Sequence, residues 1–152
     1  MVSAQRGPEG SAASTERLQK IADDLRARLT LQDAVRVVLV AHDSSVVSVQ
    51  RAKDGKDASE GFVLSFEEGF LDRLTDDEVS AAIAHELGHV WIFTHHPYLQ
   101  TEEFANQIAL RVVTRSSLET VYEKVWARTG TKGTLAYFPN EQRAADSPEP
   151  VR

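Results

Sequence analysis

The chain has 152 residues, of which 41% are hydrophobic and 26% are charged, and it carries a formal net charge of -6. This length suits one domain with a single core, and such a composition is ordinary for a soluble globular protein. The negative charge, without a cluster of lysines and arginines, argues against a nucleic-acid surface. No apolar run reaches the roughly 18 residues that a membrane span needs, and the absence of cysteine excludes disulfides and thiolate metal ligands.

The two ends of the chain differ in composition from its middle. Residues 1–13 are small and polar, with no apolar stretch of the kind found in a secretory signal, and we expect them to be flexible. The pattern of regular structure is lost after residue 130, so residues 131–152 are expected to form a C-terminal extension with a disordered end. The predicted domain is residues 14–130. The sequence does not fix its compartment: as written it suits the cytoplasm, and it would suit export if a signal peptide once preceded it.

One helix and three strands are predicted before the middle of the chain. Apolar residues recur on one helical face over residues 14–29, which indicates an amphipathic helix. Runs rich in β-branched residues predict strands at residues 34–40, 45–50 and 61–66. A polar stretch with an Asp-Gly step separates the last two strands and is typical of a hairpin connection. Residues 66–74 are then expected to form a short helix or turn.

The next predicted helix carries the most informative motif of the chain. Thr75 followed by Glu78 has the pattern of a capping box, so the helix is expected to start there. Inside it lies His85-Glu86-Leu87-Gly88-His89, and residues at i and i+4 share a helix face, so both imidazoles can reach one metal ion. Glu86 is near enough to take a proton from an attacking water, as a general base does. A lone histidine on such a face is more often a satisfied core residue, but two histidines with the intervening glutamate favour a zinc site.

A third metal ligand is expected on the following helix. Pro97 ends the motif helix, because proline disfavours helical geometry at the residue before it. Thr101 then has the pattern of an N-cap, with Glu102 and Glu103 in the first helical turn. One interpretation is that both glutamates only complement the helix dipole. The preferred one is that Glu102 completes a site of two imidazoles and one carboxylate, with Glu103 as the reserve candidate.

The C-terminal third is predicted to contain one more helix and one apolar segment. The glutamate-bearing helix continues through Val112, and Ser116-Ser117-Leu118-Glu119 offers a cap for a last helix that ends at Gly130. Residues 134–139 are an apolar segment that needs a surface to bury it. Either they lie over the catalytic cleft and restrain activity, or they cover the core behind the helices.

Other residues near the motif have simpler interpretations. His95 and His96 are expected to be exposed at the helix end, where positive charge complements the dipole. His42 follows a strand in a predicted turn and is interpreted as incidental. Trp91 and Phe93 are expected to be core residues, because aromatic residues on a buried helix usually serve packing.

These motifs resemble those of the gluzincin zinc metallopeptidases. The resemblance covers roughly residues 35–112 and is closest to the small soluble minigluzincins and to the catalytic core of the prenyl-protein and heat-shock membrane peptidases. In that family an ExxxD motif follows HExxH, and its first glutamate is the third zinc ligand, which implies this role for Glu102. Asn106 stands at the position of the family's aspartate, as it does in the ExxAN motif of the ImmA-like peptidases. From there it could accept a hydrogen bond from the outer nitrogen of a zinc-bound imidazole.

The resemblance also implies a fold and a mode of substrate binding. The expected fold class is α+β, with a small, mostly antiparallel sheet packed on the active-site helix and on the glutamate-bearing helix, as in a minimal zincin-like gluzincin. In the family, one exposed edge of the sheet binds the substrate backbone as an added strand. Residues 45–50 are the candidate for this edge.

Two features of the predicted site stay open at this level. Many zinc peptidases place a His, Tyr or Arg beyond the third ligand to stabilise the developing oxyanion. No histidine follows His96, so the candidate donors are Tyr122, Tyr137, Arg111 and Arg115. Gly88 costs helix stability, and it is expected either to allow close approach of the sheet or substrate or to make a plain packing contact.

Together these features predict a zinc-dependent endopeptidase that binds one Zn²⁺ per chain through His85, His89 and Glu102, with Glu86 as general base. The alternative is a catalytically silent module, in which the same fold binds zinc for stability or binds a protein segment along its sheet edge. The expected partner is a peptide or protein substrate, with no nucleic acid and no membrane span. The sequence predicts no oligomeric state.

Overall fold

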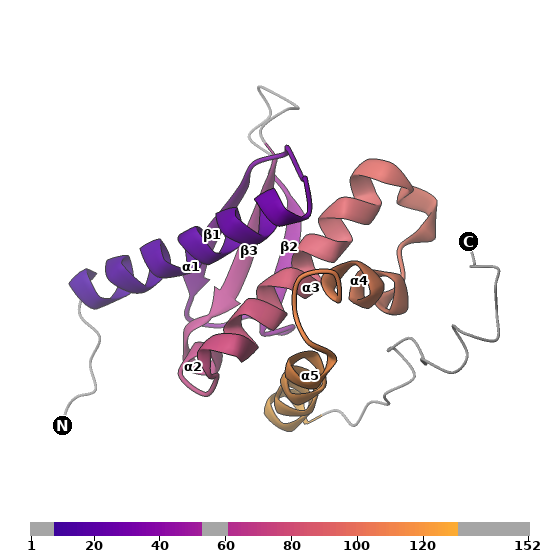
Figure 1. The fold of residues 1–152 in the computed structure, drawn as a ribbon. Coiled ribbons are helices and arrows are strands. Elements are labelled where there is room, and N and C mark those ends of the chain that lie inside the picture. The colour runs from indigo at the N-terminus through magenta and orange to yellow at the C-terminus, as the bar shows by residue number, and fades with distance from the viewer. Residues whose placement is uncertain (1–7, 53–60, 131–152) are drawn as a thin grey trace.

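The computed structural model describes residues 8–52 and 61–130, whose arrangement is shown in Figure 1. The predictions made for residues 131–152, including the role of Tyr137, lie outside the described residues. Within the described part, no helix combines the length and the apolarity needed to cross a lipid bilayer. The elements are α1 Pro8–Arg28, β1 Val35–Val40, β2 Val47–Arg51, β3 Phe62–Glu67, α2 Glu68–Leu71, α3 Asp76–His95, η2 Pro97–Leu99, α4 Glu102–Ala109 and α5 Arg115–Thr129.

Helix α1 starts at Pro8, six residues before the predicted start at residue 14. Proline suits the first turn of a helix, because its fixed φ is helical and its missing N–H needs no partner there. The predicted apolar stripe is the buried side of the helix, since Leu18, Leu25 and Leu29 are at most 3% exposed. On the same helix, the Gln19 amide donates to the carbonyl of Val35 and accepts from the N–H of Val37, so it covers part of the outer edge of β1.

The sheet has the strand order β1-β3-β2, with β3 in the centre. β1 and β3 are parallel, whereas β2 and β3 are antiparallel, so the sheet is mixed and the expectation of a mostly antiparallel sheet is wrong in this respect. The physical reason is that residues 41–46 reverse the chain without pairing β1 to β2, and β3 then inserts between them. β2 is left at the edge of the sheet, as predicted for the strand at residues 45–50.

One face of the sheet forms the core with α1 and α3. Side chains alternate along the strands, so that Val37, Leu64 and Val49 lie side by side on the inner face, and Arg36 and Gln50 are exposed on the other. α1 packs against β1 and α3, and α3 packs against β2 (Figure 1). The long helix α3 is therefore held next to the edge strand of the sheet.

Helix α3 is the central element of the fold. It begins with the predicted capping box, in which Thr75 accepts from the N–H of Glu78 and the Glu78 carboxylate accepts from the N–H of Thr75. α1, α4, α5 and β2 all pack against it, which explains why it is buried on most of its surface. It ends at His95, two residues before Pro97, as predicted.

Helix α4 crosses α3 very closely. It starts after the predicted N-cap Thr101 and ends at Ala109, three residues before the predicted end at Val112. A Cβ atom at Gly88 of α3 would collide with the backbone carbonyl of Ala105 in α4. Gly88 therefore allows the close approach of a helix, rather than that of the sheet or of a substrate.

Helix α5 is fixed to the rest of the domain by two ion pairs. Its N-cap is Thr114, two residues before the predicted cap, and Gly130 ends it in the left-handed conformation, as predicted. The Lys124 ammonium lies 2.7 Å from the Glu78 carboxylate at the start of α3. The Arg128 guanidinium lies 2.6 Å from the buried carboxylate of Glu67 at the end of β3.

Candidate metal centre

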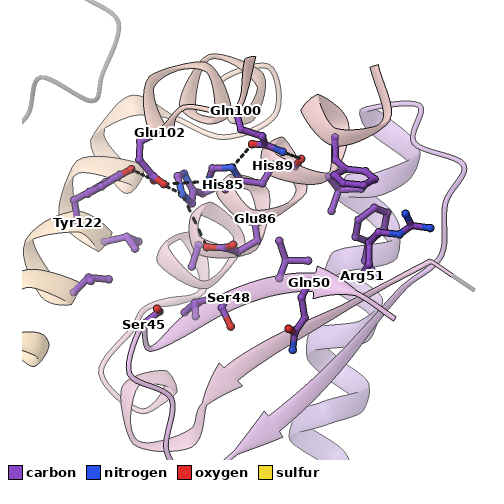
Figure 2. Close-up of a pocket in the computed structure, with 18 of the residues that line it drawn as sticks. Ser45, Ser48, Gln50, Arg51, His85, Glu86, His89, Gln100, Glu102 and Tyr122 are labelled. Carbon is purple, nitrogen blue, oxygen red and sulfur yellow. Dashed lines mark hydrogen bonds and ion pairs between the residues drawn. The ribbon is translucent and has the colours of Figure 1, made fainter. Parts of the chain in front are cut away.

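Three side chains from two helices converge at one point. His85 and His89 lie one turn apart on α3, and Glu102 is the first residue of α4 (Figure 2). The Glu102 carboxylate oxygens lie 3.0 Å from Nε2 of His85 and 3.3 Å from Nε2 of His89. One ligand atom from each of the three residues lies within 4.8 Å of the other two, so these residues could hold a metal ion.

Each imidazole is oriented by an amide. Nδ1 of His85 lies 2.8 Å from Oδ1 of Asn106, and Nδ1 of His89 lies 2.7 Å from Oε1 of Gln100. Because an amide oxygen only accepts hydrogen bonds, both Nδ1 atoms carry hydrogen, and both Nε2 atoms face Glu102. Asn106 thus makes the predicted contact with an outer imidazole nitrogen.

Gln100 is a residue that sequence reasoning missed. Its amide Nε2 also donates to the carbonyl of His89, at 2.8 Å, so the side chain is held at both ends. It lies in the connection between η2 and α4, outside both zinc motifs. The one signal for Gln100 in the sequence is its position directly before the N-cap Thr101.

The charges of the three residues are strongly coupled. The two imidazoles, His85 first, hold the pKa of the Glu102 carboxyl well below its usual range. Burial lowers the pKa of His89, but its bonds to Glu102 and Gln100 outweigh burial and raise the pKa to about 9. The pKa of His85 is raised as well, because its bond to Glu102 and the charge of Glu86 overcome its burial.

This donor set fits a zinc ion. The carboxylate of Glu102 faces both Nε2 atoms. A divalent cation held by these atoms would balance the negative charge of Glu102, since neutral imidazole nitrogen and carboxylate oxygen are good zinc ligands. Three protein ligands is the number found in catalytic zinc sites, whereas structural sites use four.

Glu86 lies beside the cluster without belonging to it. The residue is 9% exposed, and its Oε2 is 4.0 Å from Nε2 of His85. Burial raises the pKa of the Glu86 carboxyl above its usual value, although the neighbouring His85 and His89 oppose the shift. A buried carboxylate with a raised pKa accepts a proton more readily than an exposed one.

Of the three candidate donors within the described residues, Tyr122, Arg111 and Arg115, only Tyr122 lies at the site. Its hydroxyl lies 3.1 Å from the Glu102 carboxylate and 3.2 Å from the side-chain nitrogen of Asn106. Burial and the charge of Glu102 raise the pKa of Tyr122 far above its usual value, so the hydroxyl stays protonated. Arg111 lies over the ring of Trp91 at 5.0 Å, and Arg115 pairs with Glu119 at 2.7 Å.

The other candidates lie outside the cluster that the described residues form. Glu103 follows Glu102 directly, and neighbouring helical residues do not share a face, which explains why only Glu102 reaches the histidines. His95 is exposed and stacks on the Trp91 ring at 3.9 Å. His42 is exposed and lies 3.7 Å from the carboxylate of Glu67.

The cluster of His85, His89 and Glu102 lines, together with Glu86, a cavity of about 590 Å³ between α3, α5 and the edge strand β2 (Figure 2). Phe93 lines it too and is 38% exposed, with the Arg51 guanidinium 5.2 Å from its ring centre. The expectation that Phe93 is a core residue is therefore wrong, because its ring contacts Phe62 of β3 at the border of the cavity and is not enclosed by the core. On the α5 side, Tyr122 lines the wall together with three apolar side chains: Val121, Val125 and Trp126.

The sequence matches no family model and no curated protein. In three dimensions, the chain is similar to the crystal structure of the metallopeptidase zymogen abylysin from Pyrococcus abyssi. The TM-score is 0.54 at 14% sequence identity, and the match covers 77% of this chain and 99% of that chain. The predicted α+β class with a small sheet is confirmed, and the chain has a small metallopeptidase-like fold. At this identity the likeness concerns the fold alone.

Proposed function

We propose that the protein is a zinc-dependent endopeptidase of gluzincin type, with its catalytic domain in residues 14–130. The observation that carries the proposal is the convergence of His85, His89 and Glu102 beside the buried carboxylate of Glu86, at the wall of an open cavity. The likeness of the fold to a metallopeptidase supports it. One Zn²⁺ per chain would be held by the two Nε2 atoms and by the Glu102 carboxylate.

When bound at such a site, zinc acts as a Lewis acid that polarises the scissile carbonyl and lowers the pKa of its bound water to about 7. Asn106 and Gln100 keep the two imidazoles turned with Nε2 toward the site. Glu86 then takes the proton of the attacking water on its carboxylate and passes it to the leaving amine. Its raised pKa suits it to both halves of that transfer.

The substrate would be a peptide in extended conformation that lies along β2. β2 is the edge strand next to the cavity, and an edge strand offers N–H and C=O groups to an added strand. The outer edge of β1 is partly covered by Gln19, so β2 is the better edge for this purpose. Ser48 and Val49 of β2 line the cavity that contains Glu86.

The test combines elemental analysis with a hydrolysis assay on an unfolded protein substrate. Glu86→Gln keeps the shape of the side chain but removes the base, so the variant should retain zinc and lose hydrolysis by several orders of magnitude. Glu103→Gln is the matched control, because Glu103 lies outside the cluster, and it should retain both zinc and activity. A wild-type protein that binds zinc and cleaves no substrate would instead support a catalytically silent zinc-binding module.

A further inference from the structure

A chain of three hydrogen bonds joins two of the proposed ligands across three helices. His85 Nδ1 of α3 donates to Asn106 Oδ1 of α4 at 2.8 Å, and Asn106 Nδ2 donates to the Tyr122 hydroxyl of α5 at 3.2 Å. The Tyr122 hydroxyl donates to Oε1 of Glu102 at 3.1 Å. These bonds therefore run from the ring of His85 to the carboxylate of Glu102, whose Oε1 lies 3.0 Å from Nε2 of the same histidine.

The direction of these bonds requires an amide at position 106. Asn106 is fully buried, accepts on its oxygen and donates from its nitrogen. An aspartate there could accept from His85, but it would also accept from Tyr122. A hydroxyl has one hydrogen, so Tyr122 could then serve either the aspartate or Glu102, and not both.

We infer that Asn106 and Tyr122 form a matched pair that positions Glu102 for metal binding, an inference that rests on the metal centre proposed above. The asparagine at the position where the resembled family has aspartate is thus explained by the tyrosine on α5. Tyr122 acts through Glu102 and is a positioning residue. The ion pair between Lys124 and Glu78 fixes the turn of α5 that carries it.

The test is a double-mutant cycle on zinc affinity, measured by competition with a chelating dye, for the wild type, Asn106→Asp, Tyr122→Phe and the double variant. Each single substitution should weaken Zn²⁺ binding by roughly tenfold, the lower end of the range for residues that orient metal ligands. Because both substitutions break the same chain of hydrogen bonds, the double variant should bind zinc about as tightly as the single variant with the lower affinity. Tyr98→Phe is the control, because Tyr98 is 97% exposed. The zinc affinity of this variant should equal that of the wild type.

If the fold losses of zinc affinity multiply in the double variant, the two residues act independently and the inference is overturned. An unchanged zinc affinity in Tyr122→Phe would overturn it as well. The unfolding temperature of the metal-free proteins separates positioning from packing, because a purely structural role would lower this temperature and leave zinc affinity unchanged. If Asn106→Asp does not fold, Tyr122→Phe alone tests the inference, by its zinc affinity and by the unfolding temperature of its metal-free form. A wild-type protein without zinc affinity would overturn the metal centre itself, which is a different result from a failed cycle.

Discussion

Gly88 of α3 lies directly against the backbone carbonyl of Ala105 of α4, in a space too small for a Cβ atom. This contact lets α4 approach α3 closely enough for Glu102, three residues before Ala105, to reach both histidines. The glycine of the HELGH motif therefore serves the geometry of the candidate metal centre through the distance between two helices.

The first prediction concerns this contact. Gly88→Ala should force α4 away from α3, lower stability by about 1–3 kcal/mol as other overpacked cores do, and weaken zinc binding because Glu102 moves with α4. Thermal unfolding of the metal-free protein and dye competition for Zn²⁺ would measure the two effects. Intrinsic helix propensity alone would make alanine stabilising here, so a variant that is more stable and binds zinc normally would contradict the prediction.

The second prediction assigns the third ligand. Glu102→Gln should lose most of the bound zinc, because the amide carries no charge to balance the cation and binds zinc more weakly than a carboxylate. Glu103→Gln should keep one zinc per chain. Elemental analysis of both variants, purified without chelator, decides between them. The reverse result would move the ligand role to the neighbouring residue.

The third prediction concerns Gln100, which holds His89 by its ring nitrogen and by its backbone carbonyl. Gln100→Ala should weaken zinc affinity by roughly 10- to 100-fold, the usual range for residues that orient a metal ligand. Gln107→Ala removes an exposed amide from α4 and should have no such effect. Equal affinities in the two variants would show that the His89 ring needs no help from Gln100.

The fourth prediction concerns acid stability. Burial alone would raise the pKa of the Glu67 carboxyl, but Arg128 and the N–H of Asp43 outweigh burial, so its pKa in the folded protein lies below the usual value of 4.5. A lowered folded pKa means that the group stabilises the fold above about pH 4.5, and that this contribution is lost as the pH falls through the folded value.

Glu67→Gln should therefore lower the unfolding temperature at pH 7 and make it less dependent on pH below about 4.5. Glu16→Gln alters an exposed carboxylate on α1 and serves as the control. Parallel unfolding curves of Glu67→Gln and wild type through the acid range would rule out this role for the buried pair.

The fifth prediction addresses the substrate. Apart from Tyr122, the α5 wall of the cavity is apolar, so an apolar side chain next to the scissile bond should be preferred. Trp126→Ala should widen this wall and shift cleavage toward larger side chains, as read from the products of a mixed peptide library. An unchanged cleavage pattern would show that the wall does not contact the substrate.

Local features of the fold were predicted well from the sequence. The capping box at Thr75 and the terminal Gly130 fix helix ends through contacts a few residues apart, so their signals are complete in a short window. The ends of the three strands were predicted to within two residues, because a run of β-branched residues is also a signal contained in a short window. Sheet order could not be derived, because the parallel pairing of β1 with β3 depends on how residues 41–46 cross the sheet.

The candidate site was predictable where its geometry lies within one helix. His85 and His89 share a face of α3 by periodicity alone, and Glu102 was indicated by the acidic first turn of the next predicted helix together with the family resemblance. Tyr122 could not be chosen among four donors, because its position depends on α5 packing against α3 and on the ion pair between Lys124 and Glu78. Gln100 lies in the connection between η2 and α4, where there is no helical periodicity from which the direction of a side chain could be predicted.

The outer edge of β2 pairs with no other strand in the described part of the chain, which also bears on how copies of this chain meet one another. An unpaired edge that accepts an extended peptide is a template for any strand, including one from a second molecule. β2 is only five residues long, and exposed Gln50 and Arg51 stand at its end. Short length and a terminal charge are features that limit edge-to-edge polymerisation. We therefore expect concentrated solutions to stay free of fibres, because the edge is long enough to hold a short peptide and too short to sustain a growing sheet.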